Sequence, residues 1–325
     1  MKEVADTGRT KIEWASSPQM NGPIQDADTL RASSIKFVDA TNGKRLPHEL
    51  PLLSSVPFGW RGIVVEWHRL KPQEMPEHYV DGHGLAVSTG VSPISFGWKD
   101  RGRRREGQLD PGQFHLLTHG DLNTPRWLQT FDEVSLVLDR QFVADVARSG
   151  LPADRVEFAT QRSASDATIA RYAEAFRSEL QTDSSNGSLY AETLTVGLTL
   201  HLLSNYAIAK PKLPVPRGKL NSFQLRTVVD FIQAHLDQSV SLLTLSEQAR
   251  VTPFHFARLF RATVGVPPHQ FVLRQRIQRS LALIKARRLP LAQIAVESGF
   301  HDQPHFIRAF RRLIGTTPAR YSPRS

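Results

Sequence analysis

The feature that most constrains this chain is a short motif that occurs twice near its C-terminus. The pattern His-Phe-x-Arg-x-Phe-Arg spans residues 255–261 and again 305–311. Each copy is followed, at the same distances, by a glycine, a proline and an aromatic residue, so that every matched pair is 50 residues apart. A repeat with a fixed offset indicates one structural unit that is used twice.

The excess positive charge of the chain lies in the segment that contains this repeat. The 325 residues have a formal net charge of +10 at pH 7. From position 217 onward there are 17 Lys and Arg against 5 Asp and Glu, whereas the rest of the chain has 24 against 26. A solvated basic face is one explanation, but an excess confined to the repeat favours a polyanionic partner.

The composition limits the kinds of stabilising and metal sites, and the location, that the protein can have. The chain has no cysteine, which excludes disulfide frameworks and thiolate metal sites. Its first residues lack the apolar segment of a secretory signal, and its most apolar helical run, 194–203, is about half the length that a bilayer requires. We therefore expect a cytoplasmic protein, and 325 residues are enough for two domains.

The first part of the chain has the pattern of a β domain followed by helices. Short β-rich runs at 62–70, 84–88, 94–98, 113–118 and 134–138 are separated by turn residues, which favours a sandwich or small barrel. Apolar residues at helical spacing predict helices over 142–148, 164–180 and 189–208. We predict one domain over 1–209, with its β core at about 35–140 and helices at about 141–208. A proline-rich linker at 210–218 and a second domain over 219–325 follow.

The helices predicted over 164–180 and 189–208 are expected to form an antiparallel hairpin. One role for it is to cap the β core. The other is a dimer seam, because Val196, Leu200 and Leu203 widen the apolar surface beyond a single stripe. Within the predicted β region, the basic run at 101–105 is expected to be a solvated hairpin tip or a second contact to nucleic acid.

The second domain is predicted to be entirely helical. Helices are expected over 223–236, 245–250, 253–264, 268–288 and 303–314, with a short helix that ends at Ser298. Thr252 is expected to cap the helix over 253–264, and Gly265 to end it. Asp302 is expected to cap the helix over 303–314. A short helix, a tight turn and a capped second helix make a helix-turn-helix unit, whose second helix enters the major groove of DNA.

Residues outside the apolar stripes of the two second helices are the candidate DNA contacts. Arg suits guanine and Gln suits adenine, while aliphatic side chains meet thymine methyl groups. Other arginines are better placed for phosphates, which provide affinity without sequence information. The predicted contacts are Phe254, Ala257, Arg258, Arg261 and Arg274 around the first unit and Gln303, Pro304, Ile307, Arg308, Arg311 and Arg312 in the second.

The helix that connects the two units sets their separation. About 20 residues at about 1.5 Å each span about 30 Å. One turn of B-DNA is about 34 Å long. We therefore expect the two units to enter successive major grooves on one face of double-stranded DNA.

The segment 223–321 resembles the DNA-binding domain of the AraC/XylS family of transcription regulators. The resemblance is carried by the pattern Gly-Phe-x-Asp-x-x-His-Phe-x-Arg-x-Phe, two basic residues, and then Gly, Pro and Tyr, over 299–321. The chain departs from the family at Pro304, where Ser is usual, and at Arg250, where Gly is common. Phe254 and Ala257 also make the first unit more apolar. The resemblance implies a DNA-binding regulator, more often an activator that works with RNA polymerase, and a homodimer.

The first domain resembles the family's effector-binding half, a cupin-like β-barrel followed by helices. This implies a small-molecule effector, for which Trp67, His78, His83 and Trp98 are the candidate binding residues. The histidines do not form the His-x-His pair of metal-binding cupins, so no metal, cofactor or catalytic residue is predicted. A cupin-type enzyme fused to a DNA-binding module and a regulator whose first domain only dimerises are the alternatives.

Overall fold

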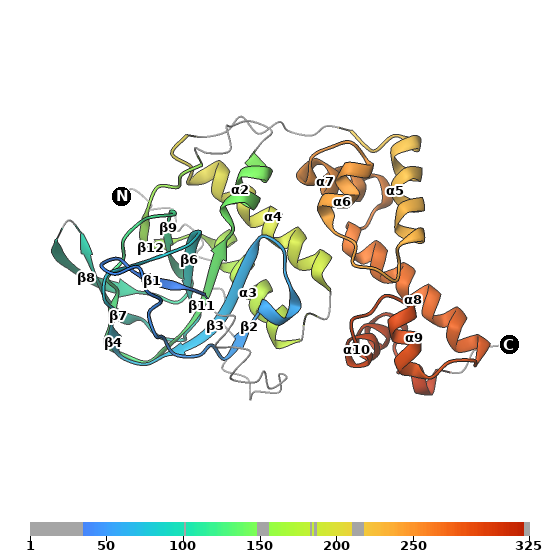
Figure 1. The fold of residues 1–325 in the computed structure, drawn as a ribbon, viewed down its shortest axis with the longest axis horizontal. Coiled ribbons are helices and arrows are strands. Elements are labelled where there is room, and N and C mark those ends of the chain that lie inside the picture. Colours follow the sequence, from blue (N-terminus) through green and yellow to red (C-terminus); the bar gives the residue numbers. More distant parts are fainter. Residues whose placement is uncertain are drawn as a thin grey trace, which may run out of the picture.

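The first domain is built on three antiparallel sheets (Figure 1). The protein is represented by a computed structural model that describes residues 35–100, 102–147, 156–182, 184, 187–209 and 218–321. The six-stranded sheet has the order β12-β9-β6-β11-β3-β2, the four-stranded sheet the order β4-β10-β7-β8, and β1 pairs with β5. The strands are β1 (Phe37–Asp39), β2 (Leu53–Ser54), β3 (Ile63–Leu70), β4 (Gln73–Glu74), β5 (His78–Val80), β6 (His83–Ser88), β7 (Ile94–Asp100), β8 (Arg103–Leu109), β9 (Gln113–Leu117), β10 (Arg126–Trp127), β11 (Phe131–Leu138) and β12 (Gln161–Ser165).

The centre of the large sheet is β11, which pairs with β3 on one side and β6 on the other. Leu136 lies opposite Val65 and Leu85, and all three side chains are almost completely buried. Successive residues are buried along the middle of β3 and β11, and because successive residues face opposite sides of a sheet, both faces are covered there. The prediction of a β domain is confirmed. The closed cupin-like barrel is not, since none of the sheets formed by the described residues closes on itself.

Helices cover one face of the large sheet. They are α2 (Arg140–Ala147), α3 (Ala167–Gln181) and α4 (Ser188–Asn205), and α3 packs against β2, β3 and β11. The prediction that this helix begins at 164 was wrong, because residues 161–165 form β12 at the edge of the sheet beside β9. Asp166 then caps α3 by accepting hydrogen bonds from the N–H groups of Thr168 and Ile169.

Helix α4 lies between the two domains. It packs against α2 and α3 on one side and against helices of the second domain on the other. Val196, Leu200 and Leu203 are 3%, 7% and 0% exposed. The broad apolar surface that suggested a dimer seam is therefore covered within the chain, and the hairpin does cap the β core.

The second domain is helical, as the sequence predicts. Its elements are α5 (Ser222–Ala234), α6 (Leu242–Gln248), α7 (Pro253–Val264), α8 (Pro268–Ala286), α9 (Leu291–Glu297), α10 (Gln303–Ile314) and a 3-10 turn (Pro318–Arg320). The predicted α6 began three residues too late, because Ser241 caps it by accepting from the N–H of Thr244. Most of the predicted linker, 210–217, lies outside the described residues.

The basic run near residue 103 belongs to a strand. Residues 103–105 begin β8, which pairs with β7 along its whole length, and the strand was missed in the sequence. Arg104 lies 2.5 Å from Glu74, and Arg105 lies 3.8 Å from Asp100. These pairs are exposed, as expected for a solvated hairpin, whereas the predicted tip residue Arg101 is outside the described residues.

Candidate functional site

The two repeat copies form two helix-turn-helix units with the same construction. In the first unit (α6 and α7), Thr252 caps α7 by accepting from the N–H of His255 at 3.4 Å. In the second unit (α9 and α10), Asp302 accepts from the N–H of His305 at 2.6 Å. Gly265 and Gly315 end α7 and α10 with φ values of 83° and 85°. The predicted caps and ends are thus confirmed.

The residue at the turn differs between the two units: the first unit has Arg250 and the second has Gly299. Arg250 has a φ of 54° and Gly299 a φ of 85°, so both turns need the left-handed region that favours glycine. At Gly299 there is a second reason for glycine, because a Cβ there would collide with the backbone carbonyl of Leu236. That carbonyl also accepts a hydrogen bond from Nε of Arg276 on α8. Arg276 therefore ties the segment after α5 to α8, next to the turn of the second unit.

Helix α8 holds the two units apart. It has 19 residues, which corresponds to a length of about 28 Å. Figure 1 shows α6 and α7 near one end of α8 and α9 and α10 near the other. The length of α8 is close to that of one turn of B-DNA, about 34 Å.

The predicted DNA contacts lie at the surface or partly exposed. Phe256, Phe260, Phe306 and Phe310 of the motifs are fully buried and form the cores of the units. His305 is also buried, with its ring 5.3 Å from that of Phe300. The exposed candidates are Arg258, Arg261, Arg274, Pro304, Arg311 and Arg312, and the half-buried ones are Phe254, Ala257, Gln303, Ile307 and Arg308.

The first turns of α4 and the glycine before it lie against the second domain. The carboxylate of Glu192 accepts hydrogen bonds from the N–H groups of Leu242 (2.7 Å) and Leu243 (3.3 Å) at the start of α6. The ring of Tyr190 lies 4.7 Å from that of His269 on α8. A Cβ on Gly187 would lie 4.0 Å from Cε1 of His305 on α10. The sequence-based prediction did not include this contact between the domains.

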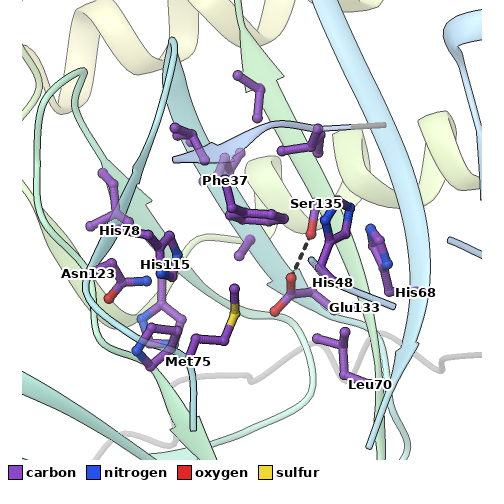
Figure 2. Close-up of a pocket in the computed structure, with 18 of the residues that line it drawn as sticks. Phe37, His48, His68, Leu70, Met75, His78, His115, Asn123, Glu133 and Ser135 are labelled. Carbon is purple, nitrogen blue, oxygen red and sulfur yellow. Dashed lines mark hydrogen bonds between the residues drawn. The ribbon is translucent and has the colours of Figure 1, made fainter. Parts of the chain in front are cut away.

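A cavity of about 100 Å³ lies between the sheets of the first domain. Figure 2 shows Phe37 and Met75 in its middle, with His48, His68, Glu133 and Ser135 on one side and His78, His115 and Asn123 on the other. Its walls come from all three sheets and from the segment around His48. Within the described residues, no cluster of three or more His, Asp or Glu side chains is arranged to hold a metal ion.

Of the four residues predicted to bind an effector, only His78 lines this cavity. Trp67 packs in the core on the other side of β3, under the guanidinium of Arg177. The ring of His83 lies 4.8 Å from that of Phe158. Trp98 is half-buried beside Phe96. His68, His115 and Glu133, which do line the cavity, were not among the predicted effector-binding residues, because lone polar residues in β-rich runs carry no distinctive spacing.

Comparisons with known proteins agree with the helix-turn-helix geometry. A family model described as a helix-turn-helix domain matches residues 245–324. The probable transcriptional regulator LumQ of Photobacterium leiognathi is 38% identical over 103 residues, which are 32% of this chain and 42% of that protein. The arabinose operon regulatory protein of Salmonella typhimurium is 26% identical over 134 residues, 41% of this chain and 46% of its own length. The chain thus spans less than half the length of these curated relatives.

Similar solved structures include one DNA-binding domain and one longer chain, and neither likeness is close enough to carry an argument. The DNA-binding domain of AdpA in complex with a target DNA is 28% identical, with 30% of this chain and 88% of that chain covered and a TM-score of 0.29. ToxT from Vibrio cholerae with a bound unsaturated fatty acid is 12% identical, covers 84% of this chain and 96% of its own, and has a TM-score of 0.33. Scores this low carry no argument about the first domain.

Two basic helix-turn-helix units on one connecting helix define a DNA-binding protein of the double helix-turn-helix class. The matched domain and relatives cover the C-terminal part of this chain, which is similar to transcription regulators such as the arabinose operon regulatory protein. None of its described helices is both long and apolar enough to span a membrane.

Proposed function

We propose that the chain is a sequence-specific transcription regulator that binds double-stranded DNA with α7 and α10 in two successive major grooves. The observation that carries this proposal is the 19-residue helix α8 between two equally capped units. Exposed arginines on both units supply the positive charge that phosphates require. Arg258 and Arg308 are the candidates for base edges, and Arg261, Arg274, Arg311 and Arg312 for phosphates.

The first domain is proposed to sense a small molecule in the cavity between its sheets. The domain, over 1–209 with a cupin-like arrangement of strands, would be joined by a linker at 210–218 to the DNA-binding domain at 219–325. We infer a cytoplasmic homodimer and, because the family it resembles more often activates than represses, an activator with RNA polymerase as its partner. The proposal of an effector site is supported by the cavity itself, which has mostly apolar walls and several histidines, a composition that small-molecule sites share.

Helix α4 is the proposed connection between the cavity and DNA. Its C-terminal end lies against the sheet, where the ring of Tyr206 is 5.7 Å from that of Phe114. Phe114 precedes the cavity residue His115 on β9. At its other end, Glu192 holds the start of α6. A shift in β9 would therefore be transmitted along α4 to the first unit.

The experiment that tests the DNA-binding function is a salt titration with the full chain. A duplex site is first selected from a random library, and its affinity is then measured by fluorescence anisotropy at several salt concentrations. With four phosphate contacts, we expect a slope of log affinity against log salt of about −4. A flat response would overturn the proposal.

A further inference from the structure

The cavity of the first domain has one end that donates hydrogen bonds. The N–H of Ser163 donates to Nδ1 of His115 at 3.2 Å, so the proton of this neutral ring must be on Nε2. That Nε2 atom is buried and has no partner among the described residues. Burial lowers the pKa of His115 to about 3, with a smaller contribution from Arg162, so the ring stays neutral. An N–H donor is therefore available at this end.

Asn123 contributes to the same end. Its Oδ1 accepts a hydrogen bond from the guanidinium of Arg162 at 2.7 Å, which leaves its amide N–H groups available. Arg162 itself does not line the cavity. A carbonyl oxygen is the group that suits two neighbouring N–H donors.

The opposite end accepts hydrogen bonds. Nε2 of His68 lies 3.1 Å from the carboxylate of buried Glu66, an acceptor, so it carries the proton of the ring. The Nδ1 of His68 is buried and has no partner among the described residues. His48 directs Nδ1 at the carbonyl of Leu46, at 3.5 Å, and its buried Nε2 likewise has no partner there. At this end, Nδ1 of His68 and Nε2 of His48 thus meet no hydrogen-bond donor among the described residues.

Glu133 lies beside these histidines. Its Oε1 accepts a hydrogen bond from the hydroxyl of Ser135 at 2.6 Å. Burial raises the pKa of Glu133, although the hydrogen bond from Ser135 acts against the shift. The other carboxylate in the wall, Glu49, has Lys71 3.5 Å away. Among the described residues that line the cavity there is no lysine or arginine.

We propose that this cavity binds a compact, uncharged and mainly apolar molecule with a hydroxyl at one end and a carbonyl at the other. The hydroxyl donates to the ring nitrogens of His48 and His68, and the carbonyl accepts from Nε2 of His115 and the amide of Asn123. The apolar body lies against Phe37, Leu70 and Met75. This assignment rests on the proposed function, in which the cavity is the effector site.

Charge and size both limit the ligand. An anion would be placed in an apolar cavity beside carboxyl groups and without a cationic side chain in its wall, which is costly. A cation would leave water for mostly apolar walls, and burial disfavours the charged form of Glu133, the buried acidic group among them. A cavity of about 100 Å³ is smaller than the roughly 150 Å³ engineered cavity that takes one benzene, so one ring is the upper limit and the walls must move outward to admit its two substituents. A single-ring ligand therefore fits better than a long chain.

A matched set of probes tests the proposal with the full chain. 4-Hydroxyacetophenone has both polar groups, 4-methoxyacetophenone lacks the donor, 4-hydroxybenzoate is an anion and tyramine is a cation. Their affinities are measured by titration calorimetry at neutral pH. We expect 4-hydroxyacetophenone to bind best, the methoxy compound about tenfold more weakly, and the two ions more weakly still.

Variants locate the binding site. His68→Leu removes one acceptor and is expected to abolish the preference for hydroxyl over methoxy. His119→Gln changes a histidine of the same domain outside the cavity wall and serves as the control that keeps this preference. Tighter binding of either ion than of 4-hydroxyacetophenone, or no binding by any of the four probes, would overturn the ligand class. If His119→Gln loses the preference for hydroxyl over methoxy as fully as His68→Leu does, the binding site lies elsewhere, and the proposal is also overturned.

A DNA titration on the same preparation separates this proposal from the proposed function. Probe binding that leaves DNA affinity unchanged would refute control by an effector but retain the ligand class. Salt-dependent DNA binding without any probe binding would refute the ligand class and retain the DNA-binding function.

Discussion

The carboxylate of Glu192 on α4 accepts a hydrogen bond from the N–H of Leu242, 50 residues away in the other domain, at 2.7 Å. Leu243 donates to the same carboxylate at 3.3 Å. Glu192 is 3% exposed, and burial raises its pKa, although the two N–H groups oppose that shift. An acidic side chain at a helix N-terminus is favourable because it satisfies N–H groups that have no partner within the helix.

Replacement of Glu192 by alanine is expected to lower the free energy of unfolding by about 1–3 kcal/mol, because one buried and one partly buried N–H group lose their acceptor. Urea denaturation followed by circular dichroism measures the change. The control is Glu157→Ala, an exposed glutamate of the same domain. Equal stability of the two variants would show that the contact does not hold the domains together.

Gly299→Ala is expected to destabilise the chain more than Gly315→Ala. Both glycines have a φ of 85°, so the backbone strain of about 1–2 kcal/mol is matched. Only at Gly299 would the new Cβ collide with the carbonyl of Leu236, whereas at Gly315 no atom lies within 4 Å. We expect an additional loss of about 1–3 kcal/mol at Gly299 in thermal or urea unfolding. Similar losses would show that the turn can move away from α5.

Stability is expected to fall in mild acid, partly because of His115. The folded pKa is lowered from 6.5 to about 3 by burial, so below pH 6.5 the unfolded chain binds a proton that the folded chain does not. The contribution is fully present above pH 6.5 and is lost as the pH falls toward 3, by up to about 1.4 kcal/mol per unit. Between pH 6.5 and 5, the wild type should lose about 2 kcal/mol more than His115→Gln in urea unfolding. Parallel losses in the two proteins would contradict this assignment.

Arg308→Ala and Arg311→Ala should differ in their effects on DNA binding. If Arg308 holds a base edge, its loss weakens binding to the selected site by about 1–3 kcal/mol and relaxes the preference at one position. Loss of Arg311 should weaken binding to all sequences and reduce the salt slope by about 1. Arg226→Ala on α5, outside both units, is the matched control. Equal loss on scrambled DNA would make Arg308 a phosphate contact.

The helical domain was predictable from the sequence because its signals are local. Pro253, Thr252 and Asp302 mark helix starts, Gly265 and Gly315 mark helix ends, and the structure uses all five as expected. Helix propensity, capping and apolar spacing agree in this segment, so each boundary is specified within a few residues. The error at α6 arose because the cap at Ser241 precedes the apolar stripe.

The first domain was less predictable because its arrangement depends on pairing between distant strands. The last two residues of β12 were assigned to a helix because the apolar pattern of α3 starts near them, and β8 was missed because its residues are mostly exposed. The cavity brings together His48, His68 and His115, which no local spacing connects. One signal was available for the domain contact, since Glu192 is the only acidic residue in the apolar helix α4.

The central claim is that two units at a fixed separation bind successive major grooves. The most direct test measures the affinity of the full chain for its selected site and for the same site with five base pairs inserted between the two half-sites. Half a turn of B-DNA would rotate one half-site to the opposite face, and α8 is a continuous helix that cannot follow it. We predict a loss of at least about tenfold in affinity and protection of only one half-site in a hydroxyl-radical footprint. Unchanged affinity, with both half-sites still protected, would contradict the account.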